Sequence, residues 1–390
     1  MKKKLSNIVG PSNVSDNPLD LEAYSYCSSE TQLEPKLVVW PGTTDQVRRV
    51  ILYANQTHTP IIIRGSGTSL ADGCIGENML ILSSERMNKI IRLDLKNKIV
   101  EVEAGIKIKE LNDVLSKFKM TFPFTPLNPT TTIGGMIALD TPTKESRFFG
   151  SIHSWLEEIE FIDGTAKHYY TKKKEAVLGK EGLSGVITRA KLRITEPPLL
   201  SIDIFKFTEL SELLGKVRVL KKDIEVYFLE FLDKKTSQAL GFGNNYVLLV
   251  AYTTLKGKKR NLLEVRRLCE LLDSVHSLLR RKGYYYLQDP YVSLEKSYDL
   301  IEWCEKNKVG LHGHISIGLF YAYFLKEDKD LIKTFKSFIK RINGCLGIGF
   351  GFGSMNKDFI SPSQKKELMK LKEEYDYNNI LNPNKAISYR

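Results

Sequence analysis

A run of β-branched residues at 61–63 leads directly into a glycine-rich stretch, and this junction is well suited to binding an anion. Gly65, Gly67 and Gly73 accept positive φ and have no side chain, so the main chain can approach a ligand closely. Successive backbone N–H groups in such a loop can bind a pyrophosphate. The simpler alternative is an ordinary turn after a strand. Neither a Rossmann nor a Walker loop fits, because Leu70 occupies the third glycine position and no Gly-Lys-Ser/Thr follows.

Two histidines in the C-terminal half form a second candidate site. His312 and His314 lie two positions apart, which would place both side chains on the same face of a strand. Imidazole titrates near neutral pH, so the pair could act as acid and base or hold a metal ion. The alternative is a pair of hydrogen-bonded histidines packed beside aromatic residues.

The elements expected around the glycine-rich stretch are short strands and one capped helix. We expect a strand within 35–41, followed by a helix whose N-cap is Thr43 or Thr44. Alternating side chains predict further strands at 80–83 and 100–103. The N-terminal half is therefore expected to mix strands and helices.

The sequence pattern changes after the two prolines at 197–198, which end a strand expected at 189–194. Beyond them we expect strands at 224–230 and 246–252 and a long helix with a basic end at 261–282. Strands and helices that alternate in this way suit an antiparallel sheet covered by helices. A domain boundary is expected directly after the prolines.

The chain carries a formal net charge of +12, which could indicate a nucleic acid, an anionic membrane surface or an anionic ligand. Its basic clusters, at 172–174 and 256–260, lack the interleaved aromatic residues of a single-strand binding surface. We therefore expect no nucleic-acid partner. A solvated surface is the simplest interpretation, with weak peripheral association with acidic lipid headgroups as the alternative.

Length and composition fit a globular protein of two domains, with 390 residues, 42% of them hydrophobic and 27% charged. The five cysteines show no paired or metal-like spacing, which favours a reducing cytoplasm. No apolar region follows the basic residues at 2–4, and no stretch is apolar enough to cross a bilayer. We expect a cytoplasmic protein, with the inner face of the membrane as an alternative location.

Four segments, in order, resemble the FAD-binding PCMH-type domain of the vanillyl-alcohol-oxidase superfamily. The resemblance is to the branch of glycolate oxidase, D-lactate dehydrogenase and D-2-hydroxyglutarate dehydrogenase. The segments are 35–47, 64–73, 126–138 and 179–188, and 375–385 is similar to the family's closing segment. In the family, the third segment is a loop beneath the flavin ring, and the fourth contacts the adenine side through its main chain. The alternative is a similar α+β domain that has lost FAD.

The resemblance implies an α+β fold in three parts. These are a two-subdomain PCMH-type FAD-binding domain at 1–199, a cap domain with an antiparallel sheet covered by helices at 200–369, and a C-terminal segment at 370–390 that returns to the FAD domain. It implies non-covalent FAD, because Thr68 stands where covalently flavinylated relatives commonly carry histidine, unless a residue such as Cys74 forms the bond. The residues expected to bind FAD are Arg64, Gly65, Ser66, Gly67, Thr68, Ser69, Pro126, Asn128, Thr132, Ile133, Gly134, Gly135, Ala138, Glu181, Gly182, Gly185, Val186, Ile187 and Asn382.

The cap domain is where the sequence departs from its relatives. Many of them hold a divalent metal with two histidines and a glutamate, and the histidine after that glutamate is the catalytic base. Here His314 keeps the first histidine, whereas Tyr321 stands in place of the second, Leu319 in place of a polar residue of the same motif, and Gly349 and Phe350 in place of the glutamate and the base. Because one imidazole cannot hold the ion, we expect no metal site.

The resemblance implies hydride transfer from a CH–OH carbon to flavin N5, while a base takes the hydroxyl proton. His314 is the first candidate for the base and Tyr321 the second. Arg281, favoured over Arg280, and His312 are expected to bind the substrate. A planar guanidinium suits a carboxylate, although cations at this position would also complement a helix dipole.

The expected substrate is a 2-hydroxy acid or a related alcohol, and the expected electron acceptor is a partner protein or a quinone. The alternative is an FAD-binding subunit, or a catalytically degenerate paralogue, that acts only within a complex.

Overall fold

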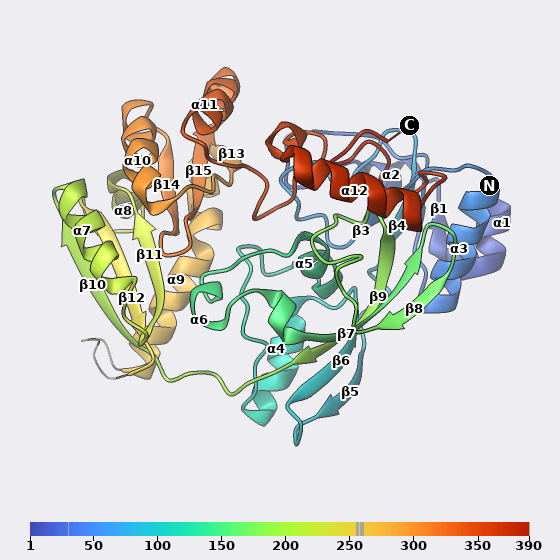
Figure 1. Ribbon diagram of the computed structural model, residues 1–390, viewed down its shortest axis with the longest axis horizontal. Helices are drawn as coiled ribbons and strands as arrows, with labels where there is room; N and C mark the ends of the chain where they lie inside the picture. The colour runs from blue at the N-terminus through green and yellow to red at the C-terminus, as the bar shows by residue number, and fades with distance from the viewer. Residues whose placement is uncertain (30, 255–256, 258–260, 390) are drawn as a thin grey trace.

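The computed structural model describes residues 1–29, 31–254, 257 and 261–389. The basic residues expected in a cluster at 256 and 258–260 lie outside the described residues. Three sheets organise the chain, with four, five and six strands. Figure 1 shows the six-stranded sheet and its helices on one side of the molecule and the other two sheets on the opposite side. No helix in the described ranges is long and apolar enough to cross a membrane.

The N-terminal sheet is mostly parallel, in the order β1-β2-β4-β3, with only β1 antiparallel. Its strands are β1 (Val14–Ser15), β2 (Leu37–Val39), β3 (Ile61–Arg64) and β4 (Leu80–Ser83), and its helices are α1 (Lys2–Val9), α2 (Pro18–Ser25) and α3 (Thr44–Gln56). Thr43 caps α3, because its hydroxyl accepts a 3.2 Å hydrogen bond from the N–H of Gln46. Apolar side chains of α1 and α3 pack on the sheet, so the end of β3 is held firmly.

The second sheet is antiparallel, in the order β5-β6-β9-β7-β8. Its strands are β5 (Ile90–Asp94), β6 (Ile99–Glu103), β7 (Leu156–Asp163), β8 (His168–Thr171) and β9 (Gly185–Arg193), and its helices are α4 (Ile108–Leu115), α5 (Ile133–Leu139) and α6 (Ser146–Phe149). The expectation of a loop through 126–138 was wrong at its end, because α5 begins at Ile133. The hydroxyl of Thr132 caps this helix by accepting from the N–H of Gly135 at 3.1 Å. The helix buries Ile133, Met136 and Ile137, a spacing too short to stand out in the sequence.

The cap sheet is antiparallel, in the order β10-β12-β11-β14-β15-β13. Its strands are β10 (Ser201–Phe207), β11 (Val226–Leu232), β12 (Tyr246–Tyr252), β13 (Tyr284–Gln288), β14 (Gly310–His314) and β15 (Leu319–Leu325). Its helices are α7 (Leu210–Leu220), α8 (Lys234–Ala239), α9 (Leu262–Arg281), α10 (Ser297–Lys306) and α11 (Lys329–Arg341). The expected strands and long helix of this half are confirmed, as is the α+β class.

Helices cover both faces of the cap sheet. Apolar residues of α7, α10 and α11 pack on one face, and α9 packs on the other. Figure 1 shows α9 on the side of the cap sheet that faces the N-terminal sheets. Since side chains alternate along a strand, the residues of β14 and β15 that point away from α10 and α11 point toward the rest of the chain.

The C-terminal segment lies against the N-terminal sheet. After α12 (Pro362–Tyr375), Ile380 and Asn382 exchange backbone hydrogen bonds with Ile61 of β3, at 2.7 and 2.8 Å. Buried Lys372 pairs with Asp376 at 2.6 Å and stabilises the turn between α12 and this segment. In Figure 1, α12 crosses the N-terminal half. The expected domain limits, after residues 199 and 369, stay predictions.

Short 3-10 helices complete the described structure; they are η1 (Pro11–Asn13), η2 (Ser116–Phe118), η3 (Ile152–Trp155), η4 (Leu294–Lys296), η5 (Lys326–Asp328) and η6 (Lys357–Phe359).

Candidate functional site

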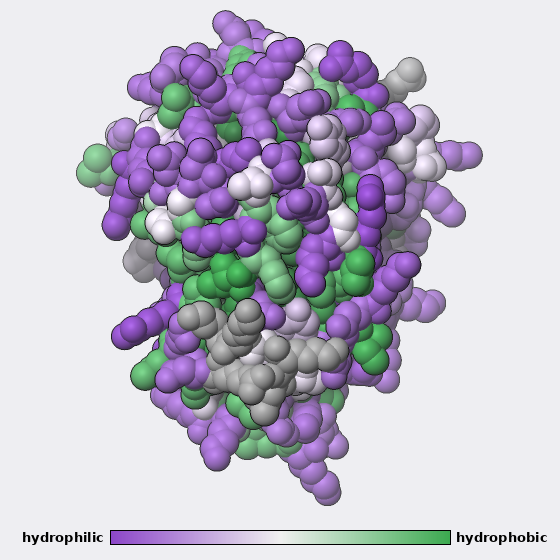
Figure 2. Space-filling model, turned by 90° about the vertical axis from the view of Figure 1, so that its left-hand side faces the viewer, coloured by the Kyte–Doolittle hydropathy of each residue, from purple (hydrophilic) through white to green (hydrophobic). Residues whose placement is uncertain are grey.

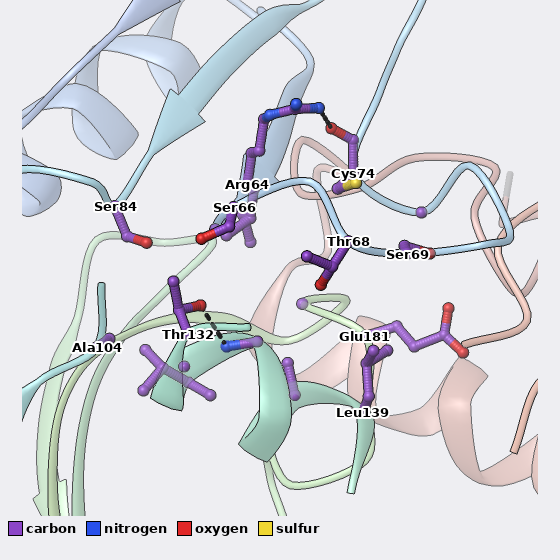
Figure 3. A pocket seen from close by; sticks show the side chains of 18 of the residues that line it. Arg64, Ser66, Thr68, Ser69, Cys74, Ser84, Ala104, Thr132, Leu139 and Glu181 are labelled. Carbon is purple, nitrogen blue, oxygen red and sulfur yellow. Dashed lines mark hydrogen bonds between the residues drawn. The ribbon is translucent and has the colours of Figure 1, made fainter. Parts of the chain in front are cut away.

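A cavity that opens to solvent lies between the two N-terminal sheets, at the end of β3 and the start of α5. Figure 3 shows side chains from the glycine-rich stretch along one side of it and those of Thr132 and Leu139 along the other. The candidate anion-binding loop therefore forms one side of this cavity.

The glycine-rich stretch offers unpaired backbone donors to this cavity. Among the described residues, no protein acceptor binds the backbone N–H groups of Ser66, Gly67 and Thr68. Gly67 has φ +72°, and a Cβ there would lie 2.3 Å from Nη2 of Arg64. Clustered free N–H groups on a backbone that only glycine adopts easily make a concave anion site.

Arg64 holds the loop from behind. Its Nη1 donates to the carbonyl oxygens of Tyr26 at 2.8 Å and Cys74 at 3.3 Å, and its guanidinium lies 5.0 Å from the ring centre of Tyr24. Through these contacts the Arg64 guanidinium has a structural role, because it supports the loop. Arg64 lines the cavity, but its Nη1 is already bound to two protein acceptors.

Two glycines that line the cavity pack closely against neighbouring residues. A Cβ on Gly65 would lie 2.4 Å from the hydroxyl of Thr132, and one on Gly134 would lie 2.8 Å from the Cβ of Ala104. A larger residue at either position would therefore displace its neighbour.

Asn382 connects the C-terminal segment to two sides of the cavity. Its Oδ1 accepts from the N–H of Ile63 at 2.8 Å, and its Nδ2 donates to the carbonyl of Glu181 at 2.6 Å. A Cβ on Gly182 would lie 2.9 Å from this Nδ2. The amide therefore fixes the spacing between β3 and the segment around Glu181.

Most of the residues expected to bind FAD line the cavity; they are Arg64, Gly65, Ser66, Gly67, Thr68, Ser69, Thr132, Gly134, Gly135, Ala138, Glu181, Gly182, Gly185, Ile187 and Asn382. Pro126, Asn128, Ile133 and Val186 do not line it. Ile133 and Val186 point into apolar cores, and Pro126 is buried. The Oδ1 of Asn128 accepts from the N–H and hydroxyl of Thr130, within its own turn.

Other lining residues carry no chemical signal in the sequence, and these are Ile63, Ser84, Ala104, Thr131 and Leu139. Gly73 and Cys74 also line the cavity, at the far end of the glycine-rich stretch. Ser84 and Ala104 directly follow β4 and β6, so strand pairing alone brings them there. A search for small residues just after expected strands could have found both.

The glycine-rich segment 347–354 closes over this region and is held by three carboxylates. Asp289 accepts from the N–H groups of Gly347, Gly349 and Phe350 at 2.8–3.1 Å. The pKa of Asp289 is raised to about 6 by burial. The segment that carries Gly349 and Phe350 therefore has its backbone bound to a buried acid.

The other two carboxylates come from the cavity side. Glu181 accepts from the N–H groups of Phe352 and Gly353 at 2.7 and 3.0 Å, and burial raises its pKa. Asp72 accepts from the N–H of Ser354 at 2.7 Å and pairs with buried Lys385 at 2.8 Å. The segment is therefore anchored to the glycine-rich stretch and to the C-terminal segment.

Three buried polar side chains of the cap sheet form a hydrogen-bonded chain. Nδ1 of His314 lies 2.5 Å from Oε1 of Glu230, and Nε2 of His314 lies 3.1 Å from the hydroxyl of Tyr321. Glu230 and His314 are paired across β11 and β14. Burial raises the pKa of Tyr321 well above its usual value, so its phenol stays neutral. This arrangement can accept and relay a proton.

Apolar contacts place the hydrogen-bonded side chains of Glu230, His314 and Tyr321 beside the glycine-rich stretch. Tyr321 packs in one buried cluster with Leu70 and Phe350. Ser69, which lines the cavity, donates from its hydroxyl to the carbonyl of Phe350 at 2.9 Å. Both catalytic candidates therefore lie where the cap meets the glycine-rich stretch.

The two substrate-binding candidates lie differently. His312 is buried and stacks between Tyr321 and Tyr323, with ring centres at 4.9 and 5.4 Å. In the described structure its Nδ1 has no hydrogen-bond partner, and burial holds its pKa well below the usual value. Arg281 is exposed at the end of α9, away from the cavity. The structure does not bring Arg281 to the site, and a cationic helix end fits its position.

Arg280 also misses the main cavity but lies in a smaller hollow. Its guanidinium is 5.6 Å from the ring centre of Tyr285, beside Ser29, Leu70 and Met355. No three His, Cys, Asp or Glu side chains are grouped as metal ligands in the described ranges. The absence of a metal site stays a prediction.

The sequence is similar to one known family and to several known proteins. A family described as the FAD binding domain matches residues 35–171. D-lactate dehydrogenase of Archaeoglobus fulgidus is 23% identical over 94% of this chain and 96% of its own. Glycolate oxidase subunit GlcD of Bacillus subtilis is 21% identical over 100% and 97%.

One further relative and one solved structure are also similar to this chain. A D-lactate dehydrogenase [cytochrome] of Saccharomyces cerevisiae is 24% identical over 59% of this chain and 43% of its own. An alkyldihydroxyacetonephosphate synthase structure superposes with a TM-score of 0.75 at 16% identity, covering 98% of this chain and 84% of that one. The resemblance drawn from the sequence motifs is confirmed, and the fold extends over the whole chain.

Proposed function

We propose that the protein is an FAD-dependent oxidoreductase acting on the CH–OH group of a hydroxy acid or related alcohol, and the proposal starts from the match of residues 35–171 to the FAD binding domain. One observation carries the proposal. The loop with free N–H groups and the Glu230–His314–Tyr321 chain meet through the cluster of Leu70, Tyr321 and Phe350. A cofactor site and a proton-accepting group therefore share one region.

The residues around the cavity suit FAD. The free N–H groups of Ser66, Gly67 and Thr68 fit a pyrophosphate, and the absence of side chains at Gly65 and Gly134 lets a ring lie close to the backbone there. When bound, FAD supplies a two-electron acceptor for hydride. The protein's own part is to hold the cofactor, orient the substrate and take up the hydroxyl proton.

The proton of the substrate hydroxyl would leave along the hydrogen-bonded side chains of Tyr321, His314 and Glu230. With Glu230 ionised, Nδ1 of His314 carries the proton and Nε2 accepts from the hydroxyl of Tyr321. A substrate hydroxyl can then lose its proton to Nε2 directly, or to Tyr321 as Tyr321 gives its own proton to Nε2. Glu230 is a positioning residue, because it acts through His314.

Anaerobic mixing of the purified protein with a panel of 2-hydroxy acids tests the proposal. We expect at least one of them to bleach the long-wavelength flavin band, with formation of the 2-oxo acid. The same acid of opposite configuration is the control. Flavin that no acid reduces, in protein that sodium dithionite reduces normally, would favour the alternative of an FAD-binding subunit that works only in a complex.

We expect catalysis without a divalent metal and a preference for an apolar substrate. Gly349, Phe350, Leu319 and Tyr321 replace polar groups of the relatives, and each lost hydrogen bond to a charged group contributes about 1.5–3 kcal/mol. Two such losses slow oxidation of a small hydroxy acid by at least about a hundredfold. Steady-state rates with D-lactate and with a 2-hydroxy acid bearing a long alkyl chain, before and after chelation, measure this.

Bound metal in stoichiometric amounts, together with fast oxidation of D-lactate that a chelator abolishes, would refute that expectation. Equal rates for the short and long acids would refute the substrate preference alone.

We also expect the flavin to be released by acid or heat. Thr68 has no imidazole to bond the flavin, and the thiol of Cys74 is buried. Precipitation with trichloroacetic acid should leave all the flavin in the supernatant. Fluorescence that stays with the denatured polypeptide on a gel would show a covalent bond.

We propose a cytoplasmic protein that passes electrons to a partner protein or a quinone and associates weakly with the inner face of the membrane. Free cysteines suit a reducing compartment. Figure 2 shows apolar side chains among the hydrophilic ones on the cap face. Strongly exposed apolar residues precede β10 and β11 and begin α9; they are Leu199, Ile224, Leu262 and Leu263.

Strand pairing brings Leu199 and Ile224 to the same end of the cap sheet. The first residues of β10 and β11 both pair with Tyr252 at the end of β12. Exposed apolar side chains on a chain of charge +12 favour an anionic bilayer. Co-sedimentation with anionic vesicles at low salt, absent with zwitterionic vesicles and weakened by Ile224→Glu, is the expected result. Equal sedimentation of that variant would contradict this assignment.

A further inference from the structure

Exposed positive charges gather around one tyrosine ring at the end of α9. Arg280 and Arg281 lie in the last turn of the helix, and Lys282 is its C-cap. The guanidinium of Arg280 lies 5.6 Å from the ring centre of Tyr285, and the ammonium of Lys326 lies 5.8 Å from the same centre. We call these five residues the basic surface. In the ranges that the structure describes, none of its four cations forms an ion pair.

The helix dipole accounts for only part of this surface. Cations in the last turn of a helix complement its dipole, but Lys326 belongs to a different element, η5. The acids of η5, Glu327 and Asp328, do not balance the four cations, and Asp328 accepts from the N–H of Leu325 at 2.8 Å. Two separate elements therefore bring cations to the exposed ring of Tyr285.

A small hollow joins the basic surface to the loop that forms the cofactor cavity. Arg280 and Tyr285 line this hollow from the cap, and Ser29 and Leu70 line it from the N-terminal half. Leu70 directly follows Ser69, which lines the main cavity. The hollow and the cavity are therefore formed by adjacent residues of one loop, and a protein seated on the basic surface would lie beside the cofactor site.

We propose that the basic surface docks an acidic electron-transfer protein, which takes electrons from the reduced flavin. This inference rests on the proposed function, because it assigns the electron acceptor of that same site. Carboxylates of the partner would pair with the four cations, and arginine and tyrosine are the residue types that often dominate the binding energy of interfaces. Two partner molecules in succession each take one electron, and the flavin loses two electrons and two protons in all.

The basic surface is distant from the residues that we assign to a bilayer. Leu262 begins α9 and Arg281 ends it, so the two are separated by the length of a helix of 20 residues, about 30 Å. Exposed charges interact little beyond the Debye length, which is about 8 Å at physiological ionic strength. The protein partner can therefore bind at one end of α9 while the other end rests on a membrane.

Reoxidation of the holoenzyme by plastocyanin, an acidic blue-copper protein, tests the proposal. The flavin is first reduced with dithionite, so the result does not depend on whether any hydroxy acid is a substrate. We expect the rate with plastocyanin to fall at least about tenfold between low salt and about 0.5 M salt. Cytochrome c, a basic acceptor, should show no such fall. A rate with cytochrome c that falls with salt, beside a rate with plastocyanin that does not, would overturn the proposal.

A pair of double variants locates the effect on the surface. Arg281→Glu combined with Lys282→Glu should slow reoxidation by plastocyanin at low salt at least about tenfold. Lys172→Glu combined with Lys173→Glu is the matched control, because it changes the net charge equally at exposed residues that follow β8. We expect the control to change the rate by less than about twofold. Equal slowing in both would assign the effect to the net charge of the chain and contradict the docking surface.

Cross-linking measures docking without any electron transfer. Carbodiimide joins an amine to a carboxylate in direct contact, so with copper(I) plastocyanin we expect cross-links at Lys282 and Lys326, mapped by mass spectrometry. Cross-links mainly at Lys172 and Lys173 would refute the assignment. Loss of sedimentation with anionic vesicles in the Arg281→Glu, Lys282→Glu variant, without loss of these cross-links, would assign the basic surface to the bilayer instead. If plastocyanin docks and reoxidises the flavin as expected but no hydroxy acid reduces it, only the proposed function fails.

Discussion

Replacing Gly67 with valine should produce a folded protein that is purified almost without FAD. Gly67 has φ +72°, which a β-branched residue strongly disfavours. A Cβ there would also lie 2.3 Å from Nη2 and 2.6 Å from Cζ of Arg64, and would displace the side chain that supports the loop. A combined loss of about 3 kcal/mol weakens binding by roughly a hundredfold. The ratio of flavin to protein absorbance, and titration of the apoprotein with FAD, measure the effect.

Gly150→Val is the matched control for this experiment. Gly150 has φ +74°, but a Cβ at this position would meet no atom within 4 Å, and the residue does not line the cavity. Both substitutions place a β-branched residue at positive φ, and only the one at Gly67 affects the site. Full flavin content in Gly67→Val would show that the loop does not hold the pyrophosphate. Equal flavin loss in both variants would assign the effect to folding.

The cofactor site could be predicted in large part because its information is local. Gly65 and Gly67 directly follow a β-branched run, and Gly134 and Gly135 follow a capping threonine, so residue type alone suggests backbone exposed to a ligand. By contrast, Ser84 enters the cavity only because β4 pairs with β3. That pairing is a tertiary fact, and no spacing in the sequence encodes it.

In the cap, the elements could be predicted from the sequence but the candidate site could not. Its strands could be predicted from apolar runs, but the neighbours β11 and β14 are far apart in the chain, with β12 and β13 between them. Glu230, the partner of His314, was therefore missed, although a single charged residue within the run 226–232 is the available signal. A charge in the middle of a buried strand requires a partner. Asp289, just after β13, was missed for the same reason.

Replacing His314 with glutamine should lower kcat by about a hundredfold to ten-thousandfold while FAD stays bound. His314 is the one imidazole in the described structure that Glu230 orients, and its Nε2 is the acceptor at the end of the chain toward Tyr321. Glutamine keeps a polar group in the buried site but cannot take a proton. Anaerobic flavin reduction under single-turnover conditions measures the step directly.

His276→Gln is the matched control, because His276 is a partly buried histidine whose ring centre lies 6.0 Å from that of Tyr323, on a different element from the buried chain. Burial lowers the pKa of His276 to about 4, so this histidine is neutral at pH 7. We expect that variant to reduce its flavin at close to the wild-type rate. Tyr321→Phe distinguishes the two proton routes, since it slows reduction only if the phenol relays the proton to Nε2. If His314→Gln retains the wild-type rate of flavin reduction, the Glu230–His314–Tyr321 hydrogen bonds are structural and the base lies elsewhere.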